Sequence, residues 1–218
     1  MTDRPADDGR VLLVDKPLGW TSFDVVNKIR KKLQIRKVGH AGTLDPLATG
    51  LLIICTGKKT REIEQYMGLD KTYTGTIVLG AESPSGDLET EPVPVADPSN
   101  LTAEQIHEAA RAFTGPISQV PPAHSAVKVG GKPAYILARK GKSVELKPRT
   151  VVIHEFEITA INLPEVSFHV RCSKGTYIRS LVRDFGAHLK VGAYLSSLRR
   201  TRIGDFRIED AATIDAIE

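Results

Sequence analysis

Apolar residues recur along this chain with two different periods, which together predict a mixture of strands and helices. Runs rich in apolar and β-branched residues predict strands at 11–14, 70–79, 151–161, 165–172 and 193–203, and a buried core segment at 51–55. Apolar residues at helical spacing predict helices that begin near positions 21, 102 and 177. Because the strands and helices do not follow a regular βαβ order, we expect an α+β fold with a central mixed, largely antiparallel sheet flanked by helices.

Capping residues indicate where several of these helices begin. Thr21 or Ser22 is expected to cap the first helix, and Thr60 a short second one. Thr102 and Gln105 form a capping-box pattern ahead of a third helix. The apolar positions expected on the first helix are Phe23, Val26, Ile29 and Leu33, and those on the short helix are Ile63 and Met67.

Two segments are too polar to belong to a core. Residues 80–100 are rich in proline, serine and acidic residues and are expected to form a long surface connection. Residues 117–150 carry many lysines and arginines, and a strand, the pair Gly130-Gly131 and a helix are expected within them. This second segment is a candidate RNA-contacting insertion; the alternative is a peripheral subdomain with a solvated basic face.

Composition and charge are those of a globular protein of the cytoplasm. Of the 218 residues, 41% are hydrophobic and 26% charged, and no segment is long and apolar enough to predict a membrane span. Residues 1–10 are polar, so we expect a disordered start and no signal peptide. Cys55 and Cys172 each lie in an apolar run, which favours reduced core thiols, and the histidines lack the spacing of a metal site. The net charge of +4 is unevenly distributed, which fits a surface that binds a polyanion and fits equally well a set of ordinary solvated helix faces.

Candidate chemistry gathers in the segment 39–52, which reads GHAGTLDPLATGLL. Asp45 lies there in a glycine-rich loop, and Pro46 biases its backbone away from the helical region. The loop runs directly into the apolar core segment, an arrangement that often carries functional side chains. Taken alone, an Asp-Pro pair is more typical of an Asx-turn than of a catalytic site.

This segment resembles the G-H-x-G-x-L-D-P-x-A-x-G-x-L signature of the TruB family of pseudouridine synthases, which act on the T-loop uridine of transfer RNA. Further segments resemble the family's other motifs in the same order, so the similarity covers roughly residues 11–205. These segments are LVDKP at 13–17, KTY at 71–73, SAVK at 125–128, SKGTYIR at 173–179 and LRR at 198–200. The resemblance implies the pseudouridine synthase fold.

The resemblance also implies an isomerase that needs neither a cofactor nor a metal. The reaction breaks the N1–C1′ bond of uridine and rejoins the base through C5. Asp45 would be the essential carboxylate, Arg179 the guanidinium that keeps it ionised and oriented, and Tyr73 a ring that stacks on the base or relays a proton. Which atom Asp45 acts on is left open by the sequence.

Substrate binding is implied for four further residues. His40 would fill the space left by a uridine extruded from its stack, and Tyr177 and Leu198 would wall the uracil pocket. Lys16 would contact phosphate or brace the pocket. Taken alone, each of these is as well explained by local packing. The basic stretches would contact the T arm of tRNA.

The chain departs from many family members, which carry a further C-terminal RNA-binding domain of the PUA type. It ends at Glu218, so we expect a catalytic domain over residues 11–218 without that appendage, acting as a monomer. Two alternatives stay open: an RNA-binding or tRNA-folding module, and a pseudouridine synthase directed by a guide RNA.

Overall fold

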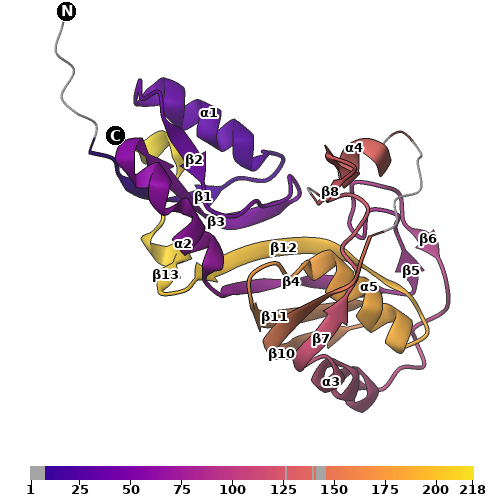
Figure 1. The fold of residues 1–218 in the computed structure, drawn as a ribbon. Coiled ribbons are helices and arrows are strands. Elements are labelled where there is room, and N and C mark those ends of the chain that lie inside the picture. Colours follow the sequence, from indigo (N-terminus) through magenta and orange to yellow (C-terminus); the bar gives the residue numbers. More distant parts are fainter. Residues whose placement is uncertain (1–7, 126, 139, 141–145) are drawn as a thin grey trace, which may run out of the picture. The chain divides into compact units, whose positions relative to one another are not determined.

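The computed structural model describes residues 8–125, 127–138, 140 and 146–218. The chain forms two compact units, one made of residues up to Tyr73 together with Leu198–Glu218, the other of Thr74–Ser197. Strands β4 (Lys71–Leu79) and β12 (Ala193–Ile203) contribute residues to both units (Figure 1). Most of the N-terminal segment that we expected to be disordered, residues 1–7, lies outside the described residues.

The first unit is built around strand β3 (Ala48–Thr56), which is buried along almost its whole length. It pairs antiparallel with β1 (Val11–Lys16) and β2 (Val38–His40), and parallel with the end of β12. One face packs against helix α1 (Ser22–Lys32) and the other against the region of α2 (Ile63–Gly68). The remaining elements are η1 (Gly57–Glu62), β13 (Phe206–Arg207), η2 (Ile208–Asp210) and η3 (Ile214–Ala216). The expected core segment at 51–55 is thus confirmed.

Helix α1 begins as predicted and buries Val26 and Ile29 as expected, but Phe23 does not belong to the buried face. Thr21 is the N-cap and shares a capping box with Asp24. The side chain of Phe23, expected inward, is 61% exposed, whereas Ser22 and Val25 are buried. The prediction for Phe23 was wrong because the helix turns Ser22 toward the loop that contains Leu44, to which its hydroxyl is bonded.

The short helix at 63–68 also differs from expectation. Thr60 does not cap it: this residue lies inside the 3₁₀ helix η1, where its hydroxyl donates to the Gly57 carbonyl. Met67, expected on the apolar face, is 47% exposed. Ile63, in contrast, packs against the core of the first unit.

The second unit contains a sheet in the order β12, β4, β11, β10, β7 (Figure 1). Strand β10 (Arg149–Asn162) is antiparallel to both β11 (Glu165–Cys172) and β7 (Gly115–Gln119). Helices α3 (Ala103–Ala112) and α5 (Ile178–His188) pack on this sheet through edge-to-face aromatic contacts. In these contacts Phe185 of α5 lies 5.4 Å from Phe156 and 6.4 Å from Phe113, between ring centroids.

Several predictions for this unit are confirmed. Thr102 caps α3 with the expected capping box, and buried and less buried residues alternate along β11. The basic insertion contains β8 (Lys128–Val129), the Gly130-Gly131 turn, β9 (Lys132–Pro133) and α4 (Ala134–Ala138); its residues 126, 139 and 141–145 lie outside the described part. The α+β class with a mixed, largely antiparallel sheet is confirmed as well.

The expected surface connection at 80–100 is partly wrong. It forms a small sheet of β5 (Ala81–Glu82) and β6 (Val93–Pro94), and Ser85 and Asp87 between these strands are buried. Their burial follows from a contact with Arg179 that no local pattern indicates. Cys55 and Cys172 are buried thiols, as expected. No helix in the described ranges combines the length and the apolar character needed to cross a membrane.

Candidate active site

Asp45 lies in the loop between β2 and β3, and its side chain is partly exposed. The Asp45 carbonyl accepts a hydrogen bond from the Ala48 N–H at 3.0 Å, which closes a turn over Pro46. Leu44, its neighbour, is buried. The loop is therefore anchored in the core of the first unit, while Asp45 itself is only partly buried.

Two glycines let the protein backbone pack closely around this loop. Gly42 and Gly50 have φ angles of 101° and 102°, which L-residues with a side chain rarely adopt. A Cβ atom at Gly50 would lie 2.3 Å from the carbonyl oxygen of Arg200. Strands β3 and β12 can approach each other here only because position 50 carries no side chain.

Lys16 braces the loop from inside. Its side chain is completely buried, and its ammonium donates to the carbonyls of Pro17 at 3.0 Å, Trp20 at 2.6 Å and Pro46 at 3.4 Å. Burial lowers the pKa of Lys16 from 10.5 to about 8, although the Asp45 carboxylate acts in the opposite direction. Of the two roles considered for this residue, the geometry fits bracing and leaves no exposed ammonium for a phosphate.

The two arginines at the end of β12 have opposite environments. Arg200 is 1% exposed and donates from Nε to the Leu51 carbonyl at 2.8 Å and from Nη2 to the Gly42 carbonyl at 3.1 Å. Arg199, on the other side of the strand, makes a half-exposed bidentate pair with Asp15 at 2.7 and 3.1 Å. Arg200 thus fixes the carbonyl of Gly42, three residues before Asp45.

Three further predicted site residues belong to the same unit. His40 ends β2, and burial together with the nearby Arg200 lowers the pKa of its imidazole, which favours the neutral ring. Tyr73 is buried in β4. Leu198 is partly exposed and pairs with Ala48, which begins β3 directly after the Asp45 loop.

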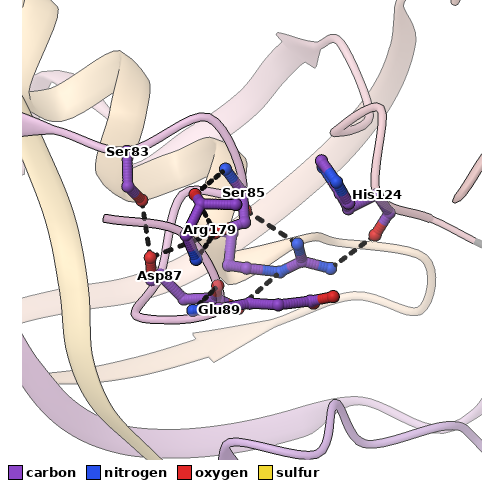
Figure 2. A network of polar contacts seen from close by, with 7 residues as sticks. Ser83, Ser85, Asp87, Glu89, His124 and Arg179 are labelled. Carbon is purple, nitrogen blue, oxygen red and sulfur yellow. Dashed lines mark hydrogen bonds and ion pairs between the residues drawn. The ribbon is translucent and has the colours of Figure 1, made fainter. Parts of the chain in front are cut away.

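Arg179 is the centre of a polar network in the second unit (Figure 2). It is buried in the first turn of α5 and donates from Nη1 to the Ser85 carbonyl and from Nη2 to the His124 carbonyl, both at 2.8 Å. Its Nε lies 3.6 Å from Oδ2 of Asp87, whose side chain is also buried. Three segments that are distant in the sequence therefore meet at one guanidinium.

Asp87 is a residue that the sequence analysis missed. The side chain of Ser83 donates to its carbonyl at 2.6 Å, and the N–H of Glu89 donates to its Oδ1 at 3.0 Å (Figure 2). Gly86 before it has a φ of 76°, and a Cβ there would lie 3.2 Å from the Cβ of Arg179. The one local signal was an acidic residue directly after glycine in a turn, which is common on protein surfaces.

Tyr177 is the N-cap of α5, and its ring is partly exposed. Its N–H donates to Oε1 of Gln119 at 2.8 Å, and the guanidinium of Arg149 lies 4.7 Å above the ring. The position is therefore fixed both from the backbone and by a cation–π contact.

The predicted residues thus fall into two groups. Asp45, Tyr73, His40, Lys16 and Leu198 belong to the first unit; the second holds Arg179 and Tyr177. The expected pairing of Asp45 with Arg179 stays a prediction. In the described ranges, no three His, Cys, Asp or Glu residues are grouped to hold a metal ion.

Comparison with known proteins places these motifs in one family. Residues 30–178 match the model described as TruB family pseudouridylate synthase (N terminal domain), and 179–218 match the tRNA pseudouridylate synthase B C-terminal domain. The chain is 54% identical over 215 residues to tRNA pseudouridine synthase B of Phocaeicola vulgatus, covering 96% of this chain and 92% of the relative. Identity to the protein of the same name from Chloroherpeton thalassium is 55%, with 96% and 89% covered.

Solved structures share the fold. The chain aligns to a chain of a Cbf5-Nop10-Gar1 complex with a TM-score of 0.75 and 32% identity, and to one of an H/ACA RNP bound to a substrate RNA containing 2′-deoxyuridine with 0.72 and 31%. Each alignment covers 97% of this chain but only 56% and 54% of the other. The chain therefore spans about half the length of these solved chains.

Proposed function

Because this chain belongs to the TruB family of pseudouridylate synthases, we propose that it isomerises the T-loop uridine (U55) of transfer RNA to pseudouridine. The observation that carries this proposal is Asp45 itself. It occupies the aspartate position of the family signature, is partly exposed, and lies on a loop fixed from several sides. Transfer RNA is found in the cytoplasm, which is the compartment we propose for the protein.

The reaction is an isomerisation, so its atoms balance without a co-substrate. The N1–C1′ bond breaks, a C5–C1′ bond forms, C5 loses a proton and N1 gains one. No electrons are exchanged with another molecule, so no redox cofactor is required. Asp45 supplies a carboxylate that can act as a nucleophile and leave again, or assist removal of the C5 proton.

The proposal assigns roles to the other predicted residues. Arg179 would keep the Asp45 carboxylate ionised and oriented once both groups engage the substrate. Tyr73 would stack on the uracil, which Tyr177 and Leu198 would enclose. His40 would occupy the space vacated by the extruded base, since a neutral imidazole can stack and hydrogen-bond there.

RNA binding is proposed to rest on exposed cations. Lys28, Lys31, Lys128 and Lys132 are exposed, and the last two lie in the basic insertion. Phosphate contacts of this kind give an affinity that falls steeply with salt, while the shape of the T arm supplies selectivity. We propose that a single chain, acting on bare tRNA without a guide RNA, is sufficient for the reaction.

The test is to incubate purified protein with unmodified tRNA and to map the isomerised position. We expect pseudouridine at the T-loop uridine in the wild type, and in Asp45→Asn a rate lower by at least about 10³-fold with RNA binding retained. Asp205→Asn, which changes an exposed aspartate, is the matched control and should react normally.

Other outcomes would overturn the proposal. Turnover by Asp45→Asn near the wild-type rate would exclude the carboxylate mechanism. Binding of tRNA with no product from the wild type would favour an RNA-folding module. Product formed only when a guide RNA is added would move the protein to the guided class of enzymes.

A further inference from the structure

Ser22 has an unusual set of hydrogen bonds for a residue in the first turn of a helix. Its hydroxyl accepts the Leu44 N–H at 2.9 Å and donates to the Leu44 carbonyl at 3.1 Å. It thereby pairs with both backbone groups of the residue that precedes Asp45. The Ser22 side chain is buried, at 2% exposed, as is Leu44 at 4%.

The helix itself does not need this hydroxyl. Serine near a helix start commonly caps the free N–H groups, but in α1 the cap is Thr21, whose hydroxyl accepts the Asp24 N–H at 3.0 Å. The Ser22 hydroxyl is therefore available to the loop. Among the described residues, Ser22 is the partner of both Leu44 backbone groups.

The Leu44 contact lies along the chain between two other contacts from side chains to the backbone of the Asp45 loop. Arg200 holds the Gly42 carbonyl on one side, and Lys16 holds the Pro46 carbonyl on the other. Both of these are charged side chains, whereas the described partner of the Leu44 backbone is the neutral Ser22 hydroxyl.

Resting on the function proposed above, we infer that Ser22 is a positioning residue for Asp45. It does not touch the substrate; it fixes the backbone from which the carboxylate projects. Without the hydroxyl, Leu44 would bury an N–H and a C=O that lack partners, an arrangement that folded proteins avoid. The loop would shift to conformers in which these groups reach water, and Asp45 would move with them.

Such a shift should affect the chemical step more than RNA binding. Covalent steps require the reacting atoms to lie near 3–3.5 Å, and a displacement of about 1 Å can cost roughly a hundredfold in rate. RNA affinity depends mainly on phosphate contacts spread over a large surface. The inference therefore predicts a fall in single-turnover rate at unchanged affinity.

The test compares Ser22→Ala with Thr21→Ala. The two residues are adjacent and both carry a hydroxyl near the start of α1. The Thr21 hydroxyl caps the helix, whereas the Ser22 hydroxyl is hydrogen-bonded to Leu44 in the loop. In Ser22→Ala we expect amide exchange at Leu44 to accelerate by about tenfold or more and the single-turnover rate to fall by roughly 10–100-fold. Thr21→Ala should lower the melting temperature but leave Leu44 exchange and the rate close to wild type.

Several results would overturn the inference. These are unchanged Leu44 exchange in Ser22→Ala, an unchanged rate, or an equal loss in Thr21→Ala. If Ser22→Ala does not fold, Ser22→Cys carries the same prediction, because a thiol fills a similar volume but is a weak donor and acceptor. A wild-type protein that forms no pseudouridine would refute the proposed function instead, and Leu44 exchange would still decide whether Ser22 holds the loop.

Discussion

The buried Lys16 ammonium should give the stability of this protein a specific dependence on pH. In the unfolded chain the lysine has a pKa of 10.5, and in the folded protein burial lowers the pKa to about 8. Between these values the unfolded chain binds the proton more tightly than the native protein. The free energy of unfolding should therefore rise as the pH increases from about 8 to about 10.5, because the native state no longer has to keep a buried charge.

The size of this effect follows from the separation of the two pKa values. The gap between 10.5 and about 8 corresponds to about 3 kcal/mol. Cys55 acts in the opposite direction, since burial raises the pKa of its thiol from 9.0 to about 11, so stability associated with this thiol is lost as the pH rises through that range. A pH profile of the wild type alone would mix the two contributions.

The assay is therefore a comparison. Urea unfolding of the wild type and of Lys16→Met is measured from pH 7 to pH 10.5, and the difference between their free energies is plotted against pH. Both proteins contain Cys55, so its contribution cancels. We expect the difference to shift by about 3 kcal/mol in favour of the wild type as the pH rises. Lys31→Met, which removes an exposed lysine of α1, should show no such trend.

Two results would refute this reasoning. A flat difference profile would mean that the Lys16 ammonium is not destabilised by burial. Asp45→Asn provides the second test: the Asp45 carboxylate raises the pKa of Lys16, so its removal should move the rise to lower pH. If the free energy of unfolding of Asp45→Asn rises over the same pH range as that of the wild type, Asp45 does not face Lys16.

Two further predictions concern stability. Asp87→Asn should cost about 3 kcal/mol in urea unfolding because it removes a buried carboxylate that lies 3.6 Å from Nε of the buried Arg179. Asp184→Asn, in a partly exposed pair, should cost no more than about 1 kcal/mol, and equal losses would contradict the importance of burial. Gly50→Ala should cost more than about 2 kcal/mol, since the position has a φ of 102° and its Cβ would lie 2.3 Å from a backbone oxygen of β12. The control is Gly68→Ala, where no atom lies within 4 Å of the added carbon. The melting temperatures of Gly50→Ala and Gly68→Ala are compared, and equal values would refute the argument.

Local patterns predicted the elements of this fold well. The buried run at 51–55, the alternation at 165–172 and the capping box at Thr102 all lie where the sequence placed them. Each depends on contacts within a turn or along a strand, so the information lies within a few neighbouring residues. The family motif around Asp45 likewise identifies the loop from the sequence alone.

The environments of individual side chains were harder to predict. Phe23 and Met67 fit an apolar helical spacing yet are exposed. Periodicity gives only the spacing of a buried face, and its orientation depends on what packs against the helix. In α1, Val26 and Ile29 pack on the apolar core of the first unit, while Ser22 instead of Phe23 faces inward, where it is hydrogen-bonded to the Leu44 backbone.

By itself, the amino-acid sequence determined where the long strands and the helices α1, α3 and α5 begin, that the run at 51–55 is buried, and which aspartate belongs to the family signature. Only the tertiary structure decided that Arg200 is buried while Arg199 is half exposed, and that Asp87 and Arg179 meet. The physical reason is that a charged group can be buried only where carbonyls or a counter-charge surround it. These partners come from segments far away along the chain, so the folded chain alone brings them together.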